Sequence, residues 1–175
     1  MFHDWDSFYL LIGSSSGALI GLLFVVATLT AGFDRDQAMR GAKVYLTPTV
    51  FHFAAVLAVS AIALAPGLGA GAAALLVGAA ALVGLVYATV VAVQLRTDRT
   101  LNVPHWSDFW FYGVAPAGTY LALAAAVLAA AAAPAAGPYA VGAALVALLL
   151  LAIRNAWDLV AWMAPGAAKS DPPRT

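Results

Sequence analysis

The chain has 175 residues, of which 64% are hydrophobic and 9% are charged, and its mean hydropathy is +0.93. A soluble domain carries roughly 25% charged residues, so this composition excludes a soluble globular protein. The net charge is zero, which gives no basic surface for nucleic acid, and the lack of cysteine excludes disulfides, thiolate metal sites and a cysteine nucleophile.

Apolar runs close to the roughly 20 residues that a spanning helix needs recur along the chain. They predict an all-α protein, a polytopic bundle of about five transmembrane helices that forms a single transmembrane domain over residues 1–175. The predicted spans are 8–33, 45–65, 70–95, 109–133 and 138–163, and a polar tail follows at 164–175. The expected surroundings of these helices are a lipid bilayer.

The first span carries small residues at regular spacing. Gly13, Gly17 and Gly21 lie four residues apart along one helical face, which lets a second helix approach closely and predicts a helix-packing face. Ser14, Ser15 and Ser16 form a polar cluster in the outer half of the same span. This cluster is interpreted either as the lining of a pore mouth or as part of the packing face, with hydroxyls bonded to carbonyls one turn earlier.

The second span is predicted to start at Thr47-Pro48, with threonine as the N-cap and proline at the first helical position, where its missing N–H costs nothing. It ends at the uncharged turn 66–69. The fourth span follows an aromatic stretch at 105–112, of the kind found at the headgroup level of a membrane.

Proline positions indicate an internal duplication. Pro48 and Pro66 are 18 residues apart, as are Pro116 and Pro134, and the same offset aligns His52 with Tyr120. The prediction is that the hairpin formed by spans two and three is repeated, in the same orientation, by spans four and five, as in the parallel repeats of transporters. The alternative is chance, because alanine-rich membrane helices resemble one another in composition.

The positive charges predict the orientation. Seven of the eight Lys and Arg residues follow spans one, three or five: Arg35, Arg40, Lys43, Arg96, Arg99, Lys169 and Arg174. The eighth, Arg154 in span five, is expected to lie near the same face. Because Lys and Arg collect in cytoplasmic loops, this pattern predicts an odd number of spans with the N-terminus outside and the C-terminus inside.

A second polar group is predicted near the inner face. Arg154, Asn155 and Asp158 interrupt the last apolar run, and His52 lies at a similar depth in span two. Arg154 and Asp158 are four residues apart and can meet on one helical face. The functional interpretation is a gating or relay layer that includes a proton-sensitive pair of His52 with Asp158. The structural one is that the charges extend to water at the interface while His52 bonds to a neighbouring helix.

No catalytic residues, cofactor or metal ligands are predicted. The acidic residues are all Asp, and neither paired carboxylates, paired histidines at metal spacing nor a Gly-x-Ser-x-Gly motif falls on a common face. The leading expectation is a non-enzymatic accessory or regulatory protein of the bacterial inner membrane, a homo-oligomer or the partner of another membrane protein. The competing one is a small oligomeric channel or facilitator for ions or small solutes.

Two stretches support a resemblance. Asp4-Trp5 and Phe8-Tyr9 followed by GALIGLLFV at 17–25, together with IRNAWDLV at 153–160, resemble small bacterial multi-pass membrane proteins of unassigned function. Some of those proteins carry the label of modulators of the membrane-anchored AAA protease. The resemblance implies an accessory role and supplies no site residue.

Overall fold

The structure, a computed structural model, describes residues 2, 4–30, 46–97 and 106–167. Its helical elements are α1 (Asp6–Thr30), α3 (Thr47–Leu64), α4 (Ala70–Thr97), α5 (Trp106–Asp108), the π-helix η2 (Phe109–Val114), α6 (Ala115–Ala132) and α7 (Gly137–Ala167). The described part of the chain contains no strand. Within it, five helical stretches are long and apolar enough to cross a membrane, which confirms the predicted all-α bundle of spans.

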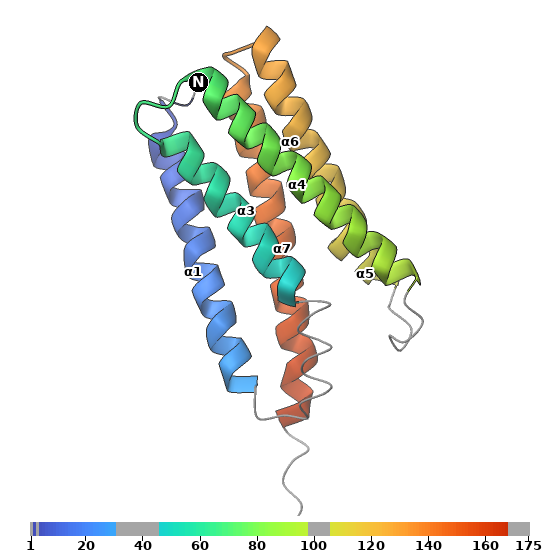
Figure 1. The fold of residues 1–175 in the computed structure, drawn as a ribbon. Helices are drawn as coiled ribbons and strands as arrows, with labels where there is room; N and C mark the ends of the chain where they lie inside the picture. The colour runs from blue at the N-terminus through green and yellow to red at the C-terminus, as the bar shows by residue number, and fades with distance from the viewer. Residues whose placement is uncertain (1, 3, 31–45, 98–105, 168–175) are drawn as a thin grey trace, which may run out of the picture.

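The four later spans form a ring. Around it, α3 packs against α4, α4 against α6, α6 against α7 and α7 against α3, and α1 lies outside the ring against α3 and α7 (Figure 1). The α3–α4 and α6–α7 turns lie at the same end of the bundle as the N-terminus, at the top of Figure 1. The last residues of α1, α4 and α7 lie towards the opposite end.

α3 begins at Thr47 with Pro48 in its first turn, so the predicted start of this helix is confirmed. The predicted N-cap is wrong by one residue. Leu46 is the N-cap, and it already has helical backbone angles, with φ −71° and ψ −46° and no side-chain cap hydrogen bond. Proline fits the first turn of a helix because its missing N–H has no partner there.

Pro116 lies within a continuous helical stretch, in agreement with the predicted span 109–133. The π-helix η2 runs directly into α6, and Val114 has helical angles of φ −66° and ψ −47°. A proline inside a regular α-helix loses one backbone hydrogen bond and its ring collides with the carbonyl one turn earlier. The wider π turn before Pro116 lets the helix continue through it.

Helix boundaries follow the predicted repeat. α3 and α6 each have 18 residues, about 27 Å at 1.5 Å per residue, and their first residues are 68 positions apart, as are their last. α3 packs against α7 as α6 packs against α4, so exchanging the two hairpins preserves these neighbours. This agreement supports the duplicated hairpin, which stays a prediction.

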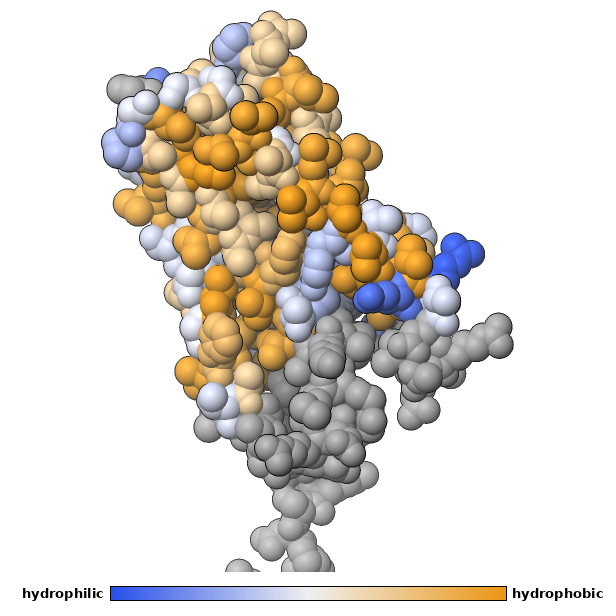
Figure 2. Space-filling view, viewed as in Figure 1, coloured by the Kyte–Doolittle hydropathy of each residue, from blue (hydrophilic) through white to orange (hydrophobic). Residues whose placement is uncertain are grey.

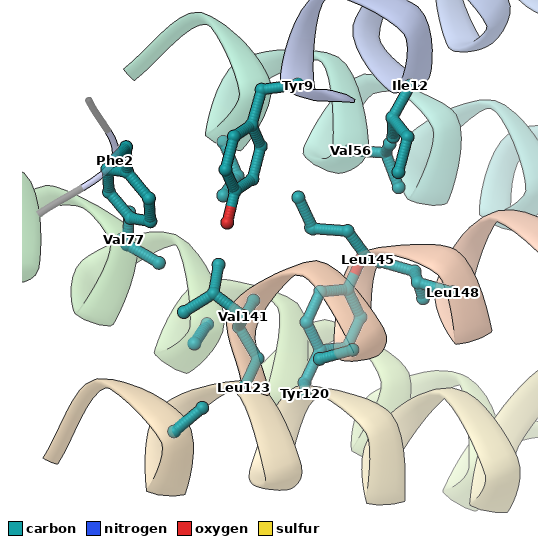
Figure 3. Packing of buried hydrophobic residues seen from close by; sticks show 14 of the residues in the cluster. Phe2, Tyr9, Ile12, Val56, Val77, Tyr120, Leu123, Val141, Leu145 and Leu148 are labelled. Atoms are coloured by element: carbon teal, nitrogen blue, oxygen red, sulfur yellow. The ribbon is translucent and has the colours of Figure 1, made fainter. Parts of the chain in front are cut away.

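An apolar core fills the bundle. The main cluster joins side chains from α1, α3, α4, α6 and α7, among them Tyr9, Val56, Val77 and Leu145, each fully buried (Figure 3). Apolar residues also cover most of the face seen in Figure 2, and the most hydrophilic residues on it lie towards the ends. Apolar surface of this extent has no stable exposure to water, so the described helices fit a lipid surrounding.

Candidate functional site

His52 lies at the centre of the ring of helices. Its side chain on α3 is fully buried, and Nδ1 lies 3.0 Å from the hydroxyl oxygen of Tyr120 on α6. α3 and α6 face each other across the ring, so this contact joins the two hairpins through the middle of the core. The two residues are those that the repeat offset aligns. When two repeats are related by a two-fold axis, equivalent residues that lie near this axis contact each other.

The direction of this hydrogen bond follows from the neighbouring groups. Nε2 of His52 is buried and has no hydrogen-bond partner among the residues that the structure describes. If Tyr120 donates to Nδ1, the N–H at Nε2 alone stays unsatisfied. If Nδ1 donates instead, both the Tyr120 hydroxyl hydrogen and the Nε2 lone pair lack partners. Each unmet buried polar group costs free energy, so the first arrangement is favoured.

A missing side chain makes room for Tyr120. A Cβ atom added at Gly84 on α4 would lie 2.2 Å from Cε1 of the Tyr120 ring. Tyr120 itself is fully buried within the main core cluster (Figure 3). Gly84 therefore lets the ring approach the α4 backbone, and the hydroxyl then reaches His52.

Aromatic rings surround the other side of the imidazole. Phe51 and Tyr87 are stacked with ring centroids 4.0 Å apart, and Tyr87 also meets the His52 ring edge-on at 6.4 Å. No charged residue forms an ion pair with His52 in the described part of the chain. Apart from the Tyr120 hydroxyl, the described contacts of the imidazole are thus with aromatic rings.

The predicted inner layer separates into two sites. Arg154, Asn155 and Asp158 do lie together on α7, but no described hydrogen bond or ion pair links them to His52. Nη1 of Arg154 lies 3.2 Å from Oδ1 of Asn155 and 3.6 Å from Oδ2 of Asp158. The proton-sensitive pair of His52 with Asp158 does not form.

The Arg154 guanidinium also contacts η2. Its Cζ lies 3.8 Å from the centroid of the Phe111 ring, a cation–π contact. Asn155 beside it is fully buried, and its Nδ2 donates to the Phe111 carbonyl at 2.9 Å. The Tyr112 hydroxyl in turn donates to the Asn155 carbonyl at 2.9 Å. These contacts fasten the start of the fourth span to the end of the fifth.

The Phe111 carbonyl is available because of Pro116. In η2 the amide of Ala115 bonds to the carbonyl of Trp110, five residues earlier. The next bond of that register would join residue 116 to Phe111, but proline has no amide hydrogen. Asn155 therefore satisfies the carbonyl that Pro116 leaves without a backbone donor.

The serine cluster is divided between packing and surface. Ser16 is fully buried and its hydroxyl donates to the Phe53 carbonyl on α3 at 2.6 Å, so it bonds across to another helix instead of to its own. Ser14 is exposed and Ser15 is half-buried. The pairing of Ser16 with Phe53 places it beside the middle of α3.

The three glycines are likewise not equivalent. A Cβ atom at Gly13 would lie 2.9 Å from Cβ of Ser60, so Gly13 provides a close contact between α1 and α3. Nothing lies within 4 Å of an added Cβ at Gly17 or Gly21. The part of the glycine face that contains these two residues is open in the monomer.

Several contact residues were missed from the sequence. Tyr120 was aligned with His52 without being predicted to bond to it, and Phe111, Tyr112 and Gly84 were not singled out. Tyr9 donates to the Pro138 carbonyl at 3.0 Å and fastens the start of α1 to α7. Tyrosines at the ends of apolar runs are a usable signal, because a buried hydroxyl needs a partner.

The chemistry available is that of helix-to-helix hydrogen bonding. The described residues contain no group of three or more His, Cys, Asp or Glu that could hold a metal ion. The cationic residues at 35, 40, 43, 99, 169 and 174, on which the orientation mainly rests, lie outside the described residues. Comparisons with protein-family models, curated proteins and solved structures found no match.

Proposed function

We propose that this chain is a non-enzymatic accessory or regulatory protein of the bacterial inner membrane that acts through contacts between helices. Its interior carries this proposal. The described core is filled with apolar side chains, and Ser16 and Asn155 bond directly to carbonyls of neighbouring helices. Polar groups used in this way fix helix positions, which supports a role in helix contacts over a role as the lining of a polar path.

The surface for such contacts is the open face of α1. Gly17 and Gly21 have free space above their backbone, and Ser14 and Ala18 beside them are exposed. Helices associate in membranes through small residues of this kind, which allow close backbone approach. The occupant of this face is a helix of a second copy or of another membrane protein, and the resemblance to protease modulators agrees with such a role.

The proposed orientation has the N-terminus outside and the C-terminus inside. Arg96 is in the last turn of α4, at the end of the bundle opposite the two hairpin turns, and Arg154 lies 17 residues along α7 from Gly137 at the turn. Asp4 and Asp6 belong to the end that has the turns. Cations at the end proposed to be cytoplasmic fit the positive-inside rule, which depends on Lys and Arg.

A flux assay tests the proposed function against the channel alternative. The purified chain is reconstituted in liposomes, and ion and small-solute flux is measured for the native protein and for His52→Ala and Asp158→Asn. We expect no flux above that of empty liposomes in any of the three. Flux in the native protein that either substitution alters would overturn the accessory function in favour of the small channel.

Cysteine crosslinking tests the contact surface. Because the chain has no cysteine, Gly21→Cys introduces a single thiol, and Leu75→Cys on the exposed side of α4 is the matched control. We expect oxidative crosslinks in native membranes at position 21 and few at position 75. Equal crosslinking at both positions would indicate random collision and contradict the α1 contact. Cysteine labelling of either terminus from outside the cell tests the orientation.

A further inference from the structure

Arg154 and Asp158 form a pair with capacity to bind something else. In the Arg154 guanidinium, Nη1 contacts both Asn155 and Asp158. The other two nitrogens, Nε and Nη2, have no hydrogen-bond partner among the described residues. The Asp158 carboxylate lies 3.6 Å from Nη1, beyond an ordinary hydrogen bond, and its side chain is 47% exposed. The pair therefore offers a ligand one positive group, the guanidinium, and one negative group, the carboxylate.

The Arg154 guanidinium is held in place by its neighbours. The Phe111 ring supports the guanidinium from one face at 3.8 Å, and Oδ1 of Asn155 accepts from Nη1 at 3.2 Å. Asn155 is fully buried and is fixed in turn by the Phe111 carbonyl. A guanidinium positioned before binding loses less conformational entropy when a ligand arrives.

The depth of the pair matches the headgroup region. Arg154 is 17 residues beyond Gly137, or about 26 Å along α7, close to the thickness of a bilayer's hydrocarbon core. Trp157 on α7 and Trp110 on η2 are exposed at the same level, where tryptophan is enriched at membrane interfaces. Exposed Leu150 and Ile153 continue towards the bilayer centre on the same side of α7.

We propose that Arg154 and Asp158 bind the headgroup of a phospholipid that carries a primary ammonium, such as phosphatidylethanolamine. The guanidinium binds the phosphate and the carboxylate binds the ammonium, while an acyl chain lies along Leu150 and Ile153. An anionic lipid would place its phosphate on Arg154 but would leave the negative charge of the Asp158 carboxylate without a partner. The zwitterionic headgroup instead balances both charges, which favours it over an anionic lipid.

This proposal rests on the membrane placement in the proposed function and is independent of the accessory role and of the leaflet. Its test is lipid retention by the purified full chain in detergent, measured by native mass spectrometry. The probes are phosphatidylethanolamine, phosphatidylcholine and phosphatidylglycerol with identical acyl chains. We expect phosphatidylethanolamine to be retained about fivefold more than either other lipid, a difference of roughly 1 kcal/mol.

Asp158→Asn is the decisive variant, because the half-exposed carboxylate does not hold the core together. It should abolish the preference for phosphatidylethanolamine over phosphatidylglycerol, and Arg154→Leu should reduce retention of all three lipids. Arg96→Gln, which removes an exposed cation from the same end of the bundle, is the control and should change nothing.

Three results would overturn the proposal. The first is equal retention of the three lipids by the native chain, and the second is an unchanged preference in Asp158→Asn. The third is displacement of the lipid by an equal concentration of soluble glycerophosphoethanolamine, which would make the ligand a free headgroup and not a lipid. Helicity by circular dichroism confirms that each variant is folded before its retention is compared.

Discussion

His52 and Asn155 are both polar and fully buried, but His52 bonds across to the other hairpin, whereas Asn155 bonds within the hairpin of the fourth and fifth spans. Asn155 uses its amide nitrogen and its amide oxygen, on Phe111 and Arg154. His52 uses Nδ1 on Tyr120 and leaves Nε2 unsatisfied among the described residues. The difference depends on whether a nearby backbone carbonyl lacks a donor in its own helix.

In a regular helix, each carbonyl accepts from an amide of its own helix, so a polar side chain in the middle of a bundle depends mainly on other side chains. A proline or a π turn interrupts that internal pairing. Asn155 lies beside such an interruption, at η2 and Pro116, and His52 contacts the regular helix α6 beyond it. Asn155 is therefore satisfied by a carbonyl of an irregular helix, whereas Ser16 shares the Phe53 carbonyl of the regular helix α3.

The largest expected effect comes from removing the space that Tyr120 occupies. In Gly84→Ala the new methyl group would overlap the Tyr120 ring, which must move away from His52. We expect a loss of about 3 kcal/mol in the free energy of unfolding, measured by denaturant titration in micelles. Gly17→Ala, which meets no atom within 4 Å, is the control and should change little. Similar losses in both variants would contradict the close contact.

Asn155→Leu removes the buried side chain whose amide nitrogen and oxygen both have hydrogen-bond partners. It leaves the Phe111 carbonyl without its donor, and we expect a loss of about 2 kcal/mol in the free energy of unfolding. Pro116→Ala restores an amide hydrogen within reach of that carbonyl. In a double-mutant cycle, Asn155→Leu should therefore cost less when Pro116 is already alanine. Additive effects would show that Pro116 does not cause the exposed carbonyl.

Tyr120→Phe tests the weaker site. It removes the hydroxyl that pairs with Nδ1 of His52, and we expect a loss of about 1 kcal/mol, within the range for hydrogen bonds between membrane helices. Adding His52→Leu should recover much of this loss, because both members of the pair are then apolar. The same denaturant titration measures both variants. A double variant less stable than Tyr120→Phe would mean that His52 has a further partner.

Ser60→Ala should have the smallest effect and the opposite sign. The Ser60 hydroxyl is buried without a described partner, and its Cβ contacts the place where a Cβ of Gly13 would lie. Removing the hydroxyl removes an unsatisfied group, so we expect a gain of about 0.5 kcal/mol in thermal or denaturant unfolding. A clear loss of stability would reveal a hydrogen bond at Ser60.

The sequence predicted the spans well and the site contacts poorly. Helix lengths and apolar content follow from each segment by itself, so the five stretches and the 68-residue offset were found without coordinates. Arg154 and Asp158 were predicted to meet because a four-residue spacing brings them together within one helix. The start of α3 was found because proline favours the first turn of a helix, but its N-cap was assigned one residue too late.

What the sequence determined by itself is that the chain forms apolar helices of membrane-spanning length, because the transfer free energy of a segment is close to a sum over its own residues. The tertiary structure decided which polar groups pair: His52 with Tyr120, Ser16 with the Phe53 carbonyl, and Asn155 with the Phe111 carbonyl. Those pairs join different helices, and their geometry depends on helix rotation and close packing, which no single segment specifies.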